Sequence, residues 1–186
     1  MLEQVLEFNR QFVENELYKP FITDRFPHKK VAILTCMDTR LVELLPAAIG
    51  NRNGDVKIIK TAGAIISHPY GSVMRSLLIA IYELGVESVW VIGHTECGME
   101  NLNVDRLVEK MKKRGISPET FDEISNSGVD FDRWLGGFES TCCAVLDSVE
   151  KIRKHPLIPK NIAVEGLLID ATTGKLTQIE KQCNCK

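Results

Sequence analysis

The sequence contains no long hydrophobic run and no strong excess of charge of one sign. No apolar stretch approaches the roughly 20 residues that a helix needs to cross a bilayer, so no transmembrane segment is predicted. The net charge of −2 gives no reason to expect nucleic acid or an anionic membrane as a partner. The first residues lack the basic region and apolar core of a secretion signal, so we expect a cytoplasmic protein.

Internal repeats, low-complexity tracts and linkers are also missing. A chain of 186 residues, with 44% hydrophobic and 26% charged residues, fits one globular domain spanning residues 1–186. Six cysteines are present, and in a reducing compartment metal binding or free thiols explain them better than disulfides do. No Cys-x-x-Cys occurs, which argues against a thiol redox protein.

Apolar runs separated by helical periodicity predict an α/β fold with a mostly parallel sheet flanked by helices. We expect strands at about 30–36, 56–60, 88–92 and 162–169, in the order 2-1-3-4, and a short antiparallel edge strand at 176–179. Helices are expected at about 2–17, 41–49, 70–84, 99–114 and 138–154, with a further helix starting after Ser117. The N-terminal helix, within residues 1–20, could pack on its own core or on a second subunit.

Two short motifs, each at the end of a predicted strand, carry the chemistry. Cys36 ends the first strand, and His94 and Cys97 follow the third. If these strands are neighbours, their carboxyl ends meet where open α/β sheets place their sites. Two thiols and one imidazole are typical zinc ligands, and a fourth position left for water is typical of a catalytic site. A buried thiol pair with a satisfied histidine, and a closed structural zinc site, are the alternatives.

Asp38 and Arg40 follow the first cysteine by two and four residues. Two thiolates already cancel the charge of a zinc ion, so bound water needs help to lose its proton. A carboxylate that accepts a hydrogen bond from zinc-bound hydroxide would orient it, and a guanidinium would hold that carboxylate ionised. Alternatively, Asp38 caps the next helix and Arg40 is a solvated charge. A turn of Asp38 onto zinc would close the open position and switch the site off.

Cys-x-Asp-x-Arg followed by His-x-x-Cys-Gly resembles the β-class carbonic anhydrases, over about residues 31–99 and most closely their small prokaryotic subgroup. The resemblance implies one zinc ion held by Cys36, His94 and Cys97, with Asp38 and Arg40 as a catalytic dyad. It implies reversible hydration of carbon dioxide to bicarbonate and a proton. It also implies a homodimer or higher oligomer, and forms in which Asp at the position of Asp38 ligates zinc.

The chain departs from that family at two places. Lys60-Thr61-Ala62-Gly63 stands where Arg-Asn-Ala-Gly is frequent, and residues 26–29 lack the glutamine of plant-type members. These departures leave the predicted metal binding intact and bear on the rate and on the substrate pocket. Two rival functions are kept: hydrolysis of a related small molecule such as carbon disulfide, and a non-catalytic zinc- or bicarbonate-binding regulator.

Several residues around the motifs are weaker candidates. Gly63 and Gly98 would let backbone approach the substrate pocket, and Ile65 and Ile66 could line it. His28 and His68 are candidate proton carriers, with ordinary exposed histidines as the alternative. The remaining residues singled out are cysteines outside the motifs: Cys142, Cys143, Cys183 and Cys185.

Neighbouring helix positions point apart, so core packing is predicted for Cys142 and Cys143 rather than a joint metal role. For Cys183 and Cys185 a second metal or a redox role is an alternative to an unstructured chain end.

Overall fold

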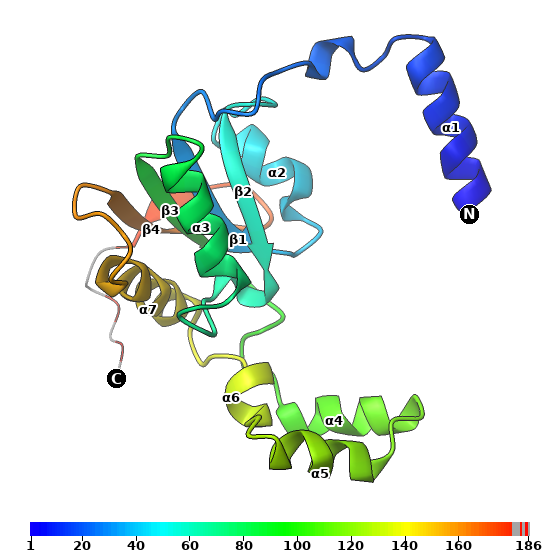
Figure 1. Ribbon diagram of the computed structural model, residues 1–186, viewed down its shortest axis with the longest axis vertical. Coiled ribbons are helices and arrows are strands. Elements are labelled where there is room, and N and C mark those ends of the chain that lie inside the picture. Colours follow the sequence, from blue (N-terminus) through cyan, green and yellow to red (C-terminus); the bar gives the residue numbers. More distant parts are fainter. Residues whose placement is uncertain (180–182, 184, 186) are drawn as a thin grey trace.

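The structure is a computed structural model that describes residues 1–179, 183 and 185. Within these residues one sheet has the order β2-β1-β3-β4-β5 (Figure 1). Its strands are β1 (Val31–Cys36), β2 (Val56–Thr61), β3 (Ser88–His94), β4 (Ala163–Ile169) and β5 (Leu176–Gln178). The first four are parallel and β5 is antiparallel to β4. The predicted fold class, strand order and antiparallel edge are confirmed.

Helices cover both faces of this sheet. In chain order the helices are α1 (Leu2–Glu14), α2 (Leu41–Ala48), α3 (Ser72–Tyr82), α4 (Val104–Lys113), α5 (Pro118–Asn126), α6 (Phe131–Leu135) and α7 (Thr141–Lys154), with short 3-10 turns η1 (Lys19–Phe21) and η2 (Ala62–Ala64). Apolar side chains of α3 and α7 pack on one face, together with alternate residues of β1, β3 and β4. Helix α2 packs on the other face. The buried strands read as continuous apolar runs because both faces are covered.

The helix predicted at 99–114 begins only at Val104. The backbone before it pairs with a distant residue instead, since the N–H of Asn101 donates to the carbonyl of Phe138 at 2.8 Å. Asn103 then caps α4 by accepting the backbone N–H of Arg106 at 2.7 Å. Helical periodicity in the sequence is therefore overridden here by a long-range backbone contact.

The same contact shortens the predicted helix at 138–154. Glu100 and Phe138 form an isolated parallel bridge, so α7 starts at Thr141. The short helix α6 between the two was not predicted, although Asp130 caps it by accepting the N–H of Arg133 at 3.0 Å.

Helix α1 lies away from the sheet (Figure 1). None of its residues is buried, and it ends at Glu14 rather than at residue 17 as predicted. Leu2, Leu6 and Phe8 are 72%, 60% and 68% exposed. Among the described residues, no helix has the length and apolar character needed to cross a membrane.

The prediction for the cysteines of α7 is wrong. Cys142 and Cys143 are half-buried rather than in the core, and they pair with Cys183 and Cys185, respectively, as disulfides. Their side chains do point apart as expected, since each meets a different partner. The pairing was not predicted because a reducing compartment was expected, where metal binding or free thiols explain cysteines better than disulfides do.

Candidate metal centre

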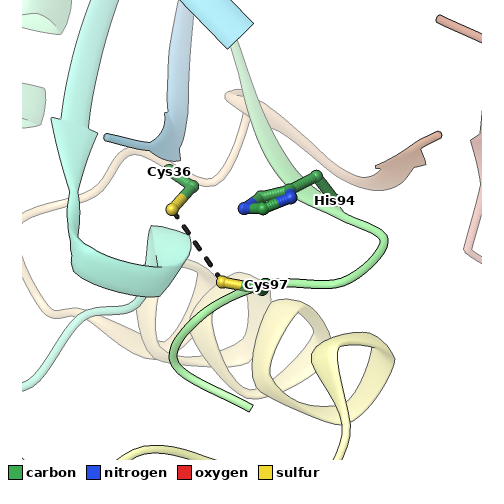
Figure 2. A group of neighbouring side chains, drawn as sticks. All are labelled: Cys36, His94 and Cys97. Carbon is green, nitrogen blue, oxygen red and sulfur yellow. Dashed lines mark hydrogen bonds between the residues drawn. The ribbon is translucent and has the colours of Figure 1, made fainter. Parts of the chain in front are cut away.

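Two sulfurs and one imidazole meet at the carboxyl edge of the sheet (Figure 2). The ligand atoms of Cys36, His94 and Cys97 lie within 4.8 Å of one another, and the two Sγ atoms are 3.9 Å apart. Two sulfurs each about 2.3 Å from one tetrahedral zinc ion would lie about 3.8 Å apart. The donor set and its spacing therefore fit zinc.

Strand topology creates this meeting point. β1 and β3 are paired neighbours, with Thr35 opposite Ile92, so both run out at the same edge. Cys36 is the last residue of β1 and His94 the last of β3. Cys97 follows in the loop after β3 and is turned back toward the site (Figure 2). All three side chains are buried, with exposures of 5%, 0% and 5%.

The imidazole of His94 is fixed for metal binding. Its Nδ1 is 2.9 Å from the carbonyl oxygen of Thr95, which makes Nδ1 the protonated nitrogen of the neutral ring. Nε2 is fully buried and has no hydrogen-bond partner among the residues that the structure describes. A buried lone pair without a donor is costly, and a metal ion would satisfy it.

The two thiols differ in their readiness to ionise. Burial opposes ionisation of Cys36, but the His94 ring and the backbone amides of Asp38 and Gly63 outweigh it and lower the pKa of this thiol to about 7. For Cys97, burial and then the nearby Cys36 sulfur outweigh the amide of Met99 and raise the pKa to about 11. Without a cation one thiol therefore stays protonated, and a divalent metal would hold both as thiolates.

Asp38 and Arg40 form a two-pronged ion pair beside these ligands. Arg40 donates from Nε to Oδ1 of Asp38 at 3.1 Å and from a terminal nitrogen to Oδ2 at 2.9 Å. The backbone N–H of Arg40 also donates to Oδ1, at 2.9 Å. These bonds lower the pKa of Asp38 to about 2, so the carboxylate is ionised at neutral pH. Oδ2 lies 3.8 Å from Nε2 of His94, which places it at the margin of the ligand set.

Glu96 is a residue that sequence reasoning missed. Its carbonyl accepts a hydrogen bond from Arg40 at 3.1 Å, and its carboxylate lies 3.3 Å from the other terminal nitrogen. Its φ of 54° turns the loop so that this carbonyl faces the guanidinium. The only sequence signal was its position between two ligands, His94 and Cys97.

The two glycines predicted at the pocket have different surroundings. Gly63 has φ 77°, and a Cβ there would lie 2.7 Å from the ring of Phe138, so the position requires glycine. Nothing lies within 4 Å of a Cβ at Gly98. Close packing therefore explains why residue 63 is glycine, whereas no such contact requires glycine at residue 98.

The predicted pocket and proton-transfer residues lie around these loops. Ile65 lines a cavity of about 280 Å³ together with Ala62 and Met99, whereas Ile66 is buried in the core. His28 and His68 are exposed; the former lies 3.8 Å from Asp55, and the latter accepts the backbone N–H of Tyr70 at 3.0 Å. Neither contact joins a histidine to the metal ligands.

Comparison with known proteins identifies related sequences along most of the chain. Residues 31–176 match the family model described as carbonic anhydrase. A Bacillus subtilis protein named "Putative carbonic anhydrase YtiB" is 54% identical over 179 residues, which cover 96% of each chain.

Solved and functionally named relatives share the scaffold. The crystal structure of β-carbonic anhydrase isoform I from Trichomonas vaginalis is 38% identical, with a TM-score of 0.86 over 96% of this chain and 97% of that one. A carbon disulfide hydrolase from Acidithiobacillus thiooxidans is 28% identical over 155 residues, covering 80% of this chain and 76% of that protein.

Proposed function

We propose, since this chain belongs to the β-class carbonic anhydrase family, that it is a zinc-dependent carbonic anhydrase, a lyase that hydrates carbon dioxide reversibly to bicarbonate and a proton. The observation that carries this proposal is the Arg40–Asp38 ion pair at the margin of a buried ligand set of two cysteines and one histidine. A purely structural metal site would need no such pair.

Cys36, His94 and Cys97 would hold the zinc ion. Bound there, zinc would make a water-derived nucleophile available near neutral pH. The contact from Nδ1 of His94 to the Thr95 carbonyl fixes the ring so that Nε2 faces the ion.

Asp38 and Arg40 are assigned complementary roles. Asp38 is ionised and can only accept a hydrogen bond. It would accept one from the attacking oxygen and so direct a lone pair of that oxygen toward carbon dioxide. Arg40 restrains the rotation of this carboxylate through two side-chain hydrogen bonds, and Glu96 holds Arg40 from the other side. Pairing with Arg40 would keep Asp38 from turning onto the metal, and loss of this pairing would allow the inactivating turn that the sequence predicts.

The substrate pocket is assigned to the loop around η2. Gly63 brings backbone close to Cys36, whose sulfur the Gly63 amide contacts, and Gly98 leaves open space beside Cys97. Ile65 and Ala62 supply apolar walls suited to a small, uncharged gas molecule.

Stopped-flow carbon dioxide hydration, measured together with zinc content, tests the assignment. The holoenzyme should accelerate hydration, and Asp38→Asn should keep zinc while losing most of the turnover. Asp105→Asn, which removes an exposed carboxylate from the first turn of α4, is the matched control and should stay active. Zinc-loaded protein without hydration activity would favour the alternative function, a non-catalytic zinc- or bicarbonate-binding regulator. Full activity of Asp38→Asn would exclude the catalytic role of the Asp38–Arg40 pair.

Carbon disulfide hydrolysis is the second candidate, because a hydrolase of that substrate shares 28% identity over most of this chain. Sulfide release from carbon disulfide by the same zinc-loaded preparation distinguishes the two. We expect carbon dioxide to be the better substrate.

We also propose a cytoplasmic homo-oligomer, with a homodimer as the smallest unit, in which α1 packs on a second copy. The helix buries none of its residues in its own chain, although it carries large exposed apolar side chains. Light scattering should show a smaller assembly for Leu6→Glu and an unchanged one for the control Gln4→Glu. An unchanged mass for Leu6→Glu would contradict this use of α1.

A further inference from the structure

Four cysteines outside the metal centre form two pairs at the first turn of α7. Cys142 is bonded to Cys183 and Cys143 to Cys185, across 41 and 42 residues of sequence. The Cα separations, 6.5 and 5.5 Å, lie within the range that disulfides span without backbone movement. Neither pair uses Cys36 or Cys97, which remain thiols.

We propose that these four cysteines are a redox-reversible clip that fastens Cys183 and Cys185 to α7. The oxidant assigned to the clip is a small-molecule disulfide. In each pair one protein thiolate attacks that disulfide and releases one small thiol; the second protein thiolate then displaces the other. The protein pair loses two protons and two electrons, and the small disulfide is reduced to two thiols.

Exposure separates these cysteines from the metal ligands. Cys142, Cys143 and Cys183 are half-buried and Cys185 is exposed, so a small thiol or disulfide can reach the clip. Cys36 and Cys97 are 5% exposed and would be covered further by a bound metal. A mild oxidant should therefore modify the clip before it modifies the metal centre.

Two disulfides explain the arrangement better than a second metal site does. Consecutive residues of a helix point about 100° apart, and Cys142 and Cys143 each meet a different partner. A four-thiolate metal site would need all four sulfurs to converge on one point. Within the described residues, the one group whose atoms converge in this way is that of Cys36, His94 and Cys97.

The disulfides close rings of the chain that include the edge of the sheet. The ring from Cys142 to Cys183 contains the rest of α7 together with β4 and β5. At one end of this ring, Thr141 and Val145 approach Gly93 so closely that a Cβ there would lie 2.7 Å from each. Closing the ring restricts the unfolded chain and holds α7 against the strand that leads to His94.

Thiol counting on the zinc-loaded protein tests the clip and does not depend on the proposed catalytic role. The protein is equilibrated in mixtures of oxidised and reduced glutathione, unfolded and alkylated so that all free thiols react, and weighed by mass spectrometry. Oxidising mixtures should protect four cysteines while zinc stays bound. The thermal midpoint should rise by on the order of 10 °C relative to the reduced protein, as closure of a ring of this size implies.

Double variants test which cysteines pair. Cys142→Ser/Cys183→Ser leaves the matched pair Cys143 and Cys185 and should still form one disulfide. Cys142→Ser/Cys185→Ser leaves the same number of cysteines but a mismatched pair, and its equilibrium constant for oxidation should be at least about tenfold smaller.

Three results would overturn the proposal. Six alkylated cysteines in the oxidised, zinc-loaded protein would show that no clip forms. Disulfide-linked dimers on a non-reducing gel would show pairing between copies instead. A second equivalent of zinc that disappears in Cys183→Ser/Cys185→Ser would make the cluster a metal site.

Discussion

Substituting Gly93 tests how the first turn of α7 supports the metal centre. Gly93 is buried in β3 next to His94 of the candidate metal centre, and a Cβ at this position would lie 2.7 Å from methyl groups of both Thr141 and Val145. Real Cβ atoms do not come that close, so in Gly93→Ala α7, the strand or both of these side chains must shift. Both contacts come from one helix turn, and rotation of a single side chain cannot relieve them.

The size of the effect follows from the cost of overpacking. Forcing one methyl group into a filled core costs about 1–3 kcal/mol, which for a chain of this length lowers the thermal midpoint by about 2–12 °C. Thermal unfolding of the zinc-loaded protein, followed by circular dichroism, measures this shift.

Gly98→Ala is the matched control. It lies on the other side of the His94–Cys97 loop, its φ is not positive, and nothing lies within 4 Å of the added methyl group. Its midpoint should stay within about 2 °C of the parent, as for an ordinary exposed substitution. Equal midpoints for Gly93→Ala and Gly98→Ala would refute the argument that α7 and β3 are packed without spare room.

The remaining predictions concern the metal and the ion pair. Arg40→Gln should keep zinc but lower kcat about five- to thirtyfold, because Asp38 loses two charge-assisted hydrogen bonds. The control Arg75→Gln, on the exposed side of α3, should leave kcat unchanged. Equal kcat values for the two variants would contradict the role of Arg40 in holding Asp38. His94→Ala should lose zinc and activity together, as elemental analysis and hydration assays would show. One zinc ion per chain in this variant would show that His94 is not a ligand. Zinc affinity, measured with a competing chelator, should fall as pH is lowered, because both thiols must be ionised to bind and the pKa of Cys97 is about 11 without metal. An affinity that stays the same between about pH 8 and about pH 6 would contradict thiolate ligation.

The sequence alone determined the sheet and the meeting of Cys36, His94 and Cys97 at its edge. Uninterrupted apolar runs identify buried parallel strands, and such strands place their carboxyl ends at one edge. Cys36 and His94 end two of these runs, so their meeting could be predicted without coordinates, and Cys97 is tied to His94 by a short loop. Asp38 and Arg40 are close in sequence, and their pairing is a local event as well.

Only the tertiary structure decided the contacts between residues far apart in the chain. Phe138 pairs with the backbone near Met99 and so ends the helical run expected there. Glu96 meets Arg40 across 56 residues, and Cys142 meets Cys183 across 41. Periodicity and spacing describe one segment at a time, so they contain no information about such partners. The packing of α7 and the loops on the sheet brings them together, and that packing depends on the whole core.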